Sequence, residues 1–160
     1  MTEVVKRDDR YLKNNQSSRM ELSMLKLIVG VKGTGKTKAL IDLVNTAAEK
    51  TAGSVVCIEK GNKLRFDIKS AVRLLDATEY MVDDAEALFG FIAGIYASNH
   101  DITEIFVDSA LKICNDDMSA FETFILKLEA FAKINDLHVA ITASTDAANI
   151  PNSLKVFVGN

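Results

Sequence analysis

Short apolar runs alternate along most of this chain with longer segments of helical periodicity. The clearest runs are residues 24–29, 55–58, 102–108 and 137–143. Nearly continuous apolar character over so few residues is typical of strands that are buried on both faces of a parallel sheet. Residues 35–49 and the segment that begins at Ser119 instead carry apolar residues at the spacing of an amphipathic helix.

A third helix is expected over about residues 83–99. Asp83 and Glu86 have the spacing of a capping box, which satisfies backbone N–H groups at a helix start. The segment is apolar almost all round, which predicts burial on more than one side. Gly90 and Gly94 each lower helix propensity by roughly 1 kcal/mol. We interpret them as allowing close packing against a neighbouring helix, with a dimer face as the alternative.

Four further features are less regular. Ser119 and Glu122 form a second capping box, ahead of an apolar stripe on the helix that follows. A short strand is expected near residues 71–75, and residues 78–82 form either a strand or an extended connection. Residues 153–158 are expected to form a last strand at the edge of the sheet.

Strands and helices that alternate in this way predict a fold of the α/β class. The expected architecture is a three-layer α/β/α sandwich with a mainly parallel sheet and right-handed crossovers. The length of 160 residues fits one such domain, over residues 24–160. Residues 1–23 are polar, of mixed charge and without periodicity, so we expect a disordered N-terminal tail there.

The composition of the chain indicates a globular protein without membrane helices. Hydrophobic residues make up 48% of the chain and charged residues 26%, as in ordinary globular proteins. No apolar run approaches the roughly 18 residues of a membrane helix, so no membrane partner is expected. The net charge of −3 does not indicate nucleic-acid binding, although a local basic strip stays open. Cys57 and Cys114 lack CxxC spacing and no secretory signal is visible, which favours a buried, reduced Cys57 and a cytoplasmic location.

The most informative stretch is the glycine loop, residues 30–37, with the sequence GVKGTGKT. It follows the apolar run 24–29 and precedes the helical segment, and it matches the pattern G-x-x-x-x-G-K-[ST] in full. In that context the backbone N–H groups of the loop and of the helix start converge on one point, where they bind phosphate oxygens. A solvent-facing glycine turn would not explain why Lys36 and Thr37 stand together at the helix start.

The loop chemistry assigns roles to particular side chains. Lys36 is expected to reach the β- and γ-phosphates of a nucleotide, and Thr37 to offer its hydroxyl to Mg²⁺. Asp108 ends the apolar strand 102–108, where a carboxylate can hold Mg²⁺ or one of its waters. The alternative for Asp108 is a helix N-cap. The candidate metal ligands are therefore Thr37 and Asp108.

The loop and the strand that ends in Asp108 resemble the Walker A and Walker B elements of P-loop NTPases. The order of elements is similar to the RecA-like, additional-strand ATPase branch and to thymidine kinases. Ser109 stands where many ATPases of that branch have a catalytic Glu, and no zinc-ligand cysteine set is present. The resemblance implies that Glu59, at the end of the strand after the first helix, activates water, and that Thr142 or Ser144 senses the γ-phosphate. The alternatives are a solvated acid and ordinary strand residues.

Together these patterns predict Mg²⁺-dependent binding of ATP, or less favourably GTP, with slow hydrolysis. The candidate catalytic residues are Lys36, Glu59 and Asp108. The candidate nucleotide-binding residues are Gly30, Val31, Lys32, Gly33, Thr34, Gly35, Lys36, Thr37, Lys38, Thr142 and Ser144. The alternatives are a nucleotide-binding regulatory or assembly module with little turnover, and a nucleoside or small-molecule kinase. Because only Arg65 and Arg73 follow the loop, a homo-oligomer or protein partner could supply an arginine.

Overall fold

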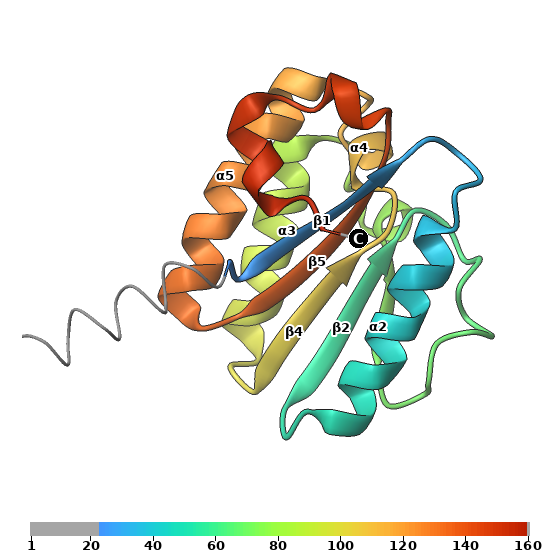
Figure 1. Ribbon diagram of the computed structural model, residues 1–160. Helices are drawn as coiled ribbons and strands as arrows, with labels where there is room; N and C mark the ends of the chain where they lie inside the picture. Colours follow the sequence, from blue (N-terminus) through green and yellow to red (C-terminus); the bar gives the residue numbers. More distant parts are fainter. Residues whose placement is uncertain (1–22, 160) are drawn as a thin grey trace, which may run out of the picture.

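The described part of the chain, residues 23–159 of a computed structural model, forms a five-stranded sheet between layers of helices (Figure 1). The expected N-terminal tail lies outside the described residues, apart from Ser23. The strands are β1 (Leu25–Gly30), β2 (Ser54–Glu59), β3 (Arg73–Asp76), β4 (Ile102–Val107) and β5 (His138–Ser144). The α-helices are α2 (Lys36–Lys50), α3 (Ala85–Ser98), α4 (Ala110–Ile113) and α5 (Met118–Asn135), and the 3₁₀ helices are η1 (Ala77–Tyr80), η2 (Ala147–Asn149) and η3 (Asn152–Phe157).

The sheet has the strand order β1-β5-β4-β2-β3, and each neighbouring pair is parallel. Figure 1 shows α2 on one face of the sheet and α3 with α5 on the other. This arrangement confirms the predicted three-layer α/β/α sandwich. All carboxyl ends of the strands meet at one edge, the edge where ligands bind in open α/β sheets.

The core explains why the strands have almost no polar alternation. Val55 and Cys57 of β2 pack in the cluster beneath α2, whereas Val56 and Ile58 pack in the cluster beneath α3 and α5. Successive side chains of a strand point to opposite faces, so a sheet covered on both faces needs apolar residues at every position. Each fully buried aliphatic side chain of this kind contributes about 1.5–3 kcal/mol.

The expected strand at residues 153–158 is wrong, because residues Asn152–Phe157 form the 3₁₀ helix η3. Leu154 is fully buried and Phe157 packs against the core, whereas Val156 is 76% exposed. An apolar pair three residues apart suits the three-residue turn of a 3₁₀ helix rather than the alternation of a strand. Of residues 153–158, only Val158 pairs with the sheet, through an isolated parallel bridge to Leu27 of β1.

The two predicted capping boxes are also wrong by one or two positions. Asp84, not Asp83, caps α3 and accepts a hydrogen bond from the N–H of Ala87. Asp117, not Ser119, caps α5 and accepts from the N–H of Ala120. In both places a neighbouring residue had an equally suitable side chain, since Asp and Ser both cap helices well.

The predicted packing of α3 is wrong in part. Its buried residues, Ala85, Leu88 and Ile92, lie on one face of the helix, and apolar residues on both sides of that face are partly buried against the core. A methyl group placed on Gly90 or Gly94 would meet no atom of the described chain within 4 Å. These glycines therefore do not serve close packing within the described chain, and the dimer-face alternative stays a prediction.

The shorter expected elements have mixed outcomes. The strand expected near 71–75 is present as β3, whereas residues 78–82 form no strand. Residues Ala77–Tyr80 are the 3₁₀ helix η1, because the Asp76 carboxylate accepts from the N–H of Thr78 and starts a turn there. Among the described residues no helix combines the length and the apolar character that a membrane crossing requires.

Candidate functional site

The glycine loop joins β1 to α2 at the carboxyl edge of the sheet. Gly33 and Gly35 have φ angles of +87° and +84°, a left-handed conformation that side chains with a Cβ rarely adopt. Gly35 is the N-cap of α2, and no described side chain caps that end or places an acid in the first turn. The first N–H groups of a helix lack intrahelical partners, so this helix start presents donors and a positive dipole end to an anion.

Lys36 curls back over the glycine loop instead of extending into solvent. Its ammonium group donates to the carbonyl oxygen of Val31 at 2.9 Å, and the residue is only 9% exposed. An ammonium group has three N–H donors, so this bond leaves donors for a ligand at the same place. The loop thus holds a cation inside its own curve.

Asp108, which directly follows β4, is the centre of a hydroxyl cluster. Its Oδ1 accepts from Thr142 Oγ1 at 2.7 Å and from Thr37 Oγ1 at 3.3 Å. Its Oδ2 accepts from Ser109 Oγ at 3.3 Å. Asp108 is buried, and its donors come from the start of α2, from β5 and from its own neighbour. The fold therefore brings Thr37 and Asp108 together, although 71 residues separate them in the chain.

Thr142 lies behind Asp108 rather than at the cavity surface. It is 2% exposed, and its Oγ1 accepts from the backbone N–H of Ser109 at 2.8 Å while donating to Asp108. Ser109 has a φ of +58°, a left-handed conformation that is costly for a residue with a side chain. The hydroxyl of Thr142 thus holds both Asp108 and the turn that follows β4.

Glu59 is the last residue of β2, at the same carboxyl edge of the sheet as Asp108, and it is 3% exposed. Its carboxylate accepts from the backbone N–H groups of Lys63 at 2.8 Å and Leu64 at 3.3 Å, both in the loop that follows. Burial raises the pKa of Glu59 above its usual value, and the charges of Asp108 and Asp76 act in the same direction. The two backbone hydrogen bonds oppose that rise in pKa.

A cavity of about 910 Å³ lies over these groups. It contains most of the predicted site: Gly33, Gly35, Lys36, Thr37, Lys38, Glu59, Asp108 and Ser144 are among its lining residues, together with Lys32. The predicted residues that do not line it are Gly30, Val31, Thr34 and Thr142. Six lysines and three acids line the cavity, and this excess of positive charge, in a chain of net charge −3, suits an anionic ligand.

Sequence reasoning missed several lining residues. Lys60 and Lys63 lie in the loop after β2, and their two positive charges are the signal that could have pointed to them. Lys112 lies on α4, whose four residues are too few to show periodicity. Asp116, next to the helix cap Asp117, is a further lining residue.

Models of known protein families and the curated proteins were compared with this chain. Neither comparison finds a match. The architecture itself, a parallel sheet covered by helices, is compatible with P-loop and Rossmann-like folds.

Proposed function

We propose that this protein binds a nucleoside triphosphate, ATP or else GTP, together with Mg²⁺, and hydrolyses it slowly. One observation carries the proposal: the fold joins Lys36 and Thr37 of a complete Walker A loop to Asp108 at the end of a distant strand, in one cavity rich in lysine. The donors in the loop and the cation suit phosphate oxygens. We assign the chain to the P-loop NTPases on this basis.

The residues present also fit Mg²⁺. Thr37 and Asp108 supply a hydroxyl and a carboxylate, the hard oxygen ligands that this ion prefers. Mg²⁺ commonly takes one or two protein oxygens and completes its shell with water and phosphate oxygens, so two protein ligands suffice. When bound, it would neutralise charge on the phosphates. Thr142 and Ser109 would orient the Asp108 carboxylate toward it through their hydrogen bonds.

The strand order supports the additional-strand branch in particular. Strand β5 lies between the loop strand β1 and the Asp108 strand β4. It places Ser144 beside Gly30 in the sheet register and at the cavity wall, where a hydroxyl could contact the γ-phosphate. Of the two sensor candidates we favour Ser144, because the single hydroxyl hydrogen of Thr142 is directed at Asp108.

A second function, a nucleotide-binding switch or assembly module with little turnover, is favoured by one observation. The carboxylate of Glu59 accepts from the N–H groups of Lys63 and Leu64, so the loop after β2 fixes its position and leaves fewer of its lone pairs for a water molecule. Ser109 follows Asp108 directly and has no carboxylate, so it cannot act as the base in place of Glu59. Hydrolysis in this case would need a residue from a partner.

Direct binding of Mg²⁺-ATP to the wild type and to Lys36→Ala tests the proposal. We expect affinity to fall about 10–100-fold in Lys36→Ala, since hydrogen bonds to charged groups contribute about 1.5–3 kcal/mol. Lys50→Ala, at the other end of α2, is the matched control and should bind like the wild type. Equal affinity of Lys36→Ala and the wild type would refute the nucleotide assignment.

Single-turnover hydrolysis then separates the two functions. If Glu59 activates water, Glu59→Gln should bind ATP normally and lose hydrolysis by about 10²–10⁴-fold. If the protein is a switch, the wild type and Glu59→Gln should both bind ATP and both fail to hydrolyse it.

A further inference from the structure

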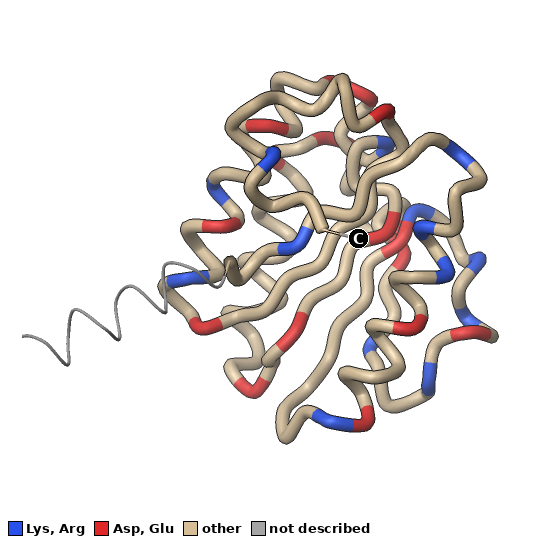
Figure 2. The backbone as a smooth tube through the Cα atoms, in the orientation of Figure 1, with Lys and Arg blue, Asp and Glu red and all other residues tan. Residues whose placement is uncertain are grey.

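Residues 60–73, the link between β2 and β3 with the first residue of β3, are strongly basic. They contain five cations, Lys60, Lys63, Arg65, Lys69 and Arg73, and one acid, Asp67. All of these residues are exposed. Figure 2 shows the resulting group of blue positions on the loop beside α2. We call residues 60–73 the basic segment.

The basic segment has a fixed inner side. Leu64, Ile68 and Val72 are buried in the cluster beneath α2. At its start, the N–H of Gly61 donates to the carboxylate of Asp76 at 2.9 Å, and Glu59 holds the N–H of Lys63. A segment anchored in this way presents its outward side chains in defined positions.

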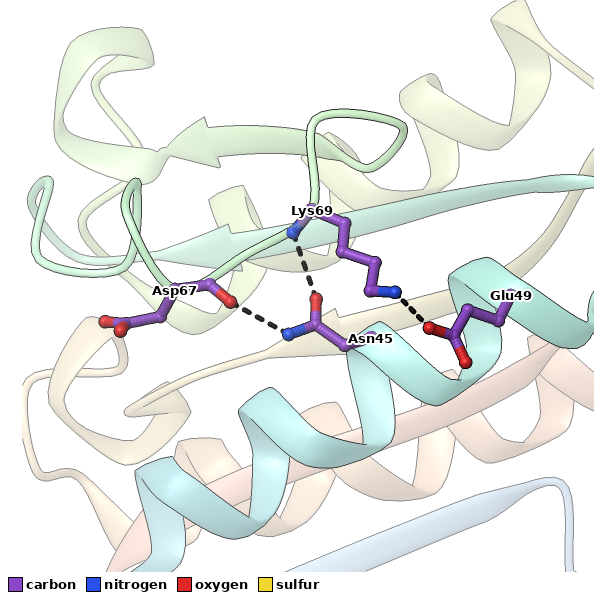
Figure 3. A network of polar contacts seen from close by, with 4 residues as sticks. All are labelled: Asn45, Glu49, Asp67 and Lys69. Atoms are coloured by element: carbon purple, nitrogen blue, oxygen red, sulfur yellow. Dashed lines mark hydrogen bonds and ion pairs between the residues drawn. The ribbon is translucent and has the colours of Figure 1, made fainter.

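Helix α2 anchors the middle of the segment through its side chains (Figure 3). Asn45 donates to the carbonyl oxygen of Asp67 at 2.8 Å and accepts from the N–H of Lys69 at 3.0 Å. One turn further along α2, Glu49 pairs with the ammonium group of Lys69. The helix that begins at the glycine loop is therefore attached directly to the basic segment.

The outward side of the segment combines an aromatic ring with cations. Phe66 is 86% exposed although its neighbours Leu64 and Ile68 are buried. The guanidinium carbon of Arg65 lies 4.6 Å from the centre of the Phe66 ring. Arg65 also lines a hollow of about 510 Å³, together with Lys69 and Arg73, whereas Phe66 lies outside its lining. An aromatic face next to a cationic hollow is the combination that binds a stacked base and its phosphates.

We propose that the basic segment binds single-stranded nucleic acid, with a base on Phe66 and phosphates on Arg65, Arg73 and the lysines at its start. An unpaired base can stack on an exposed ring, whereas paired bases in a duplex cannot reach it. An acidic protein would use the cations but would have no need for the exposed ring, so we favour nucleic acid. Lys60 and Lys63 also line the cavity at the glycine loop, which makes the two sites neighbours.

This inference does not depend on the proposed nucleotide binding, because the surface is complete without it. The test measures fluorescence anisotropy of labelled oligo(dT) and oligo(rU), about 15 nucleotides long, with the full chain and without nucleotide. We expect affinity to fall as salt rises from about 50 to about 200 mM. Phe66→Ala should weaken binding about tenfold, and Phe66→Trp should restore it.

The double variant Arg65→Ala/Arg73→Ala should weaken binding and lower the slope of log affinity against log salt by about 1.4. Lys155→Ala/Val156→Ala is the matched control, since this exposed cation and apolar residue lie on η3, at the opposite edge of the sheet. It should bind like the wild type, and circular dichroism checks that all variants fold. The proposal is overturned if Phe66→Ala binds like the wild type, if the control loses as much affinity, or if an acidic peptide or a duplex competes as well as single strands.

Discussion

Asp108 and Glu59 are buried acids at the ends of neighbouring strands, yet the chain holds them in different ways. Asp108 accepts from hydroxyl groups that come from β5 and from the start of α2, far away in sequence. Glu59 accepts from backbone N–H groups four and five residues further along its own loop. One acid is placed by the tertiary fold and the other by its local turn.

The difference has consequences for function. The hydroxyl groups around Asp108 can rotate, and their oxygen atoms can also bind a cation. The side chains can therefore change partners around a cation while the backbone hydrogen bonds stay in place. Glu59 lines the cavity but is held by N–H groups at the start of the basic segment, so a movement of its carboxylate would also disturb that loop. We therefore infer that Asp108 serves binding directly, and that any action of Glu59 is coupled to the loop at residues 60–64.

The largest expected effect on Mg²⁺ binding is that of Asp108→Asn. Mg²⁺ should raise the ATP affinity of the wild type, and this gain should be smaller in Asp108→Asn by a factor on the order of 10–100. The reason is that an amide is a weaker ligand than a carboxylate for a hard cation. Titration of ATP with and without Mg²⁺ measures it. Glu59→Gln is the matched variant and should retain the Mg²⁺ dependence of the wild type. Equal losses in the two variants would contradict the division of roles.

A smaller effect is expected for Thr142→Val. This change preserves shape but removes the donor to Asp108 and leaves the N–H of Ser109 without its acceptor. Unfolding in urea should show a loss of about 1–3 kcal/mol, the cost of unsatisfied buried polar groups. Thr142→Ser retains the hydroxyl and should recover most of the stability.

Ser144→Ala supplies the control for Thr142→Val, because Ser144 lies on the same strand but is exposed at the cavity wall. Its stability should stay within about 0.5 kcal/mol of the wild type. Equal destabilisation by the two changes would show that the hydroxyl of Thr142 has no special part in holding Asp108.

The strands and the glycine loop could be predicted because their signals are local and repeated. Continuous apolar runs such as 55–58 identify strands buried on both faces, and the rule that parallel strands end at one edge brings Asp108 to Thr37. The structure shows that contact, while the ligand itself stays a prediction. Cys57 is a buried free thiol, as expected, and burial raises its pKa to about 12.

The remaining segments could not be predicted because their structure depends on distant partners. Leu64, Ile68 and Val72 have helical spacing but lie in a series of turns, held by Asn45 and Glu59 from other elements. The apolar run 153–158 was mistaken for a strand because its burial, at Leu154 and Phe157, depends on contacts with α5 and β1. The engagement of Glu59 by the next turn likewise has no signature in the residue pattern.

The smallest expected effect concerns the pH dependence of stability. Burial raises the pKa of Glu59, so folding favours the protonated carboxyl, and its contribution to stability is lost as the pH rises through the folded pKa. Glu59→Gln has no charge to bury, so its stability relative to the wild type should increase from acid to neutral pH. Urea unfolding at several pH values measures the difference.

Glu49→Gln should behave in the opposite way. The hydrogen bond from Lys69 lowers the pKa of Glu49, so its contribution is present at neutral pH and is lost as the pH falls through the folded pKa. Relative to the wild type, Glu49→Gln should therefore be less stable at neutral pH and equal in acid. If the stabilities of Glu59→Gln and Glu49→Gln, relative to the wild type, both fell from acid to neutral pH, the raised pKa of Glu59 would be wrong. Its N–H partners, Lys63 and Leu64, would then outweigh its burial, and Glu59 would be a charged anchor of the loop at every pH near neutrality.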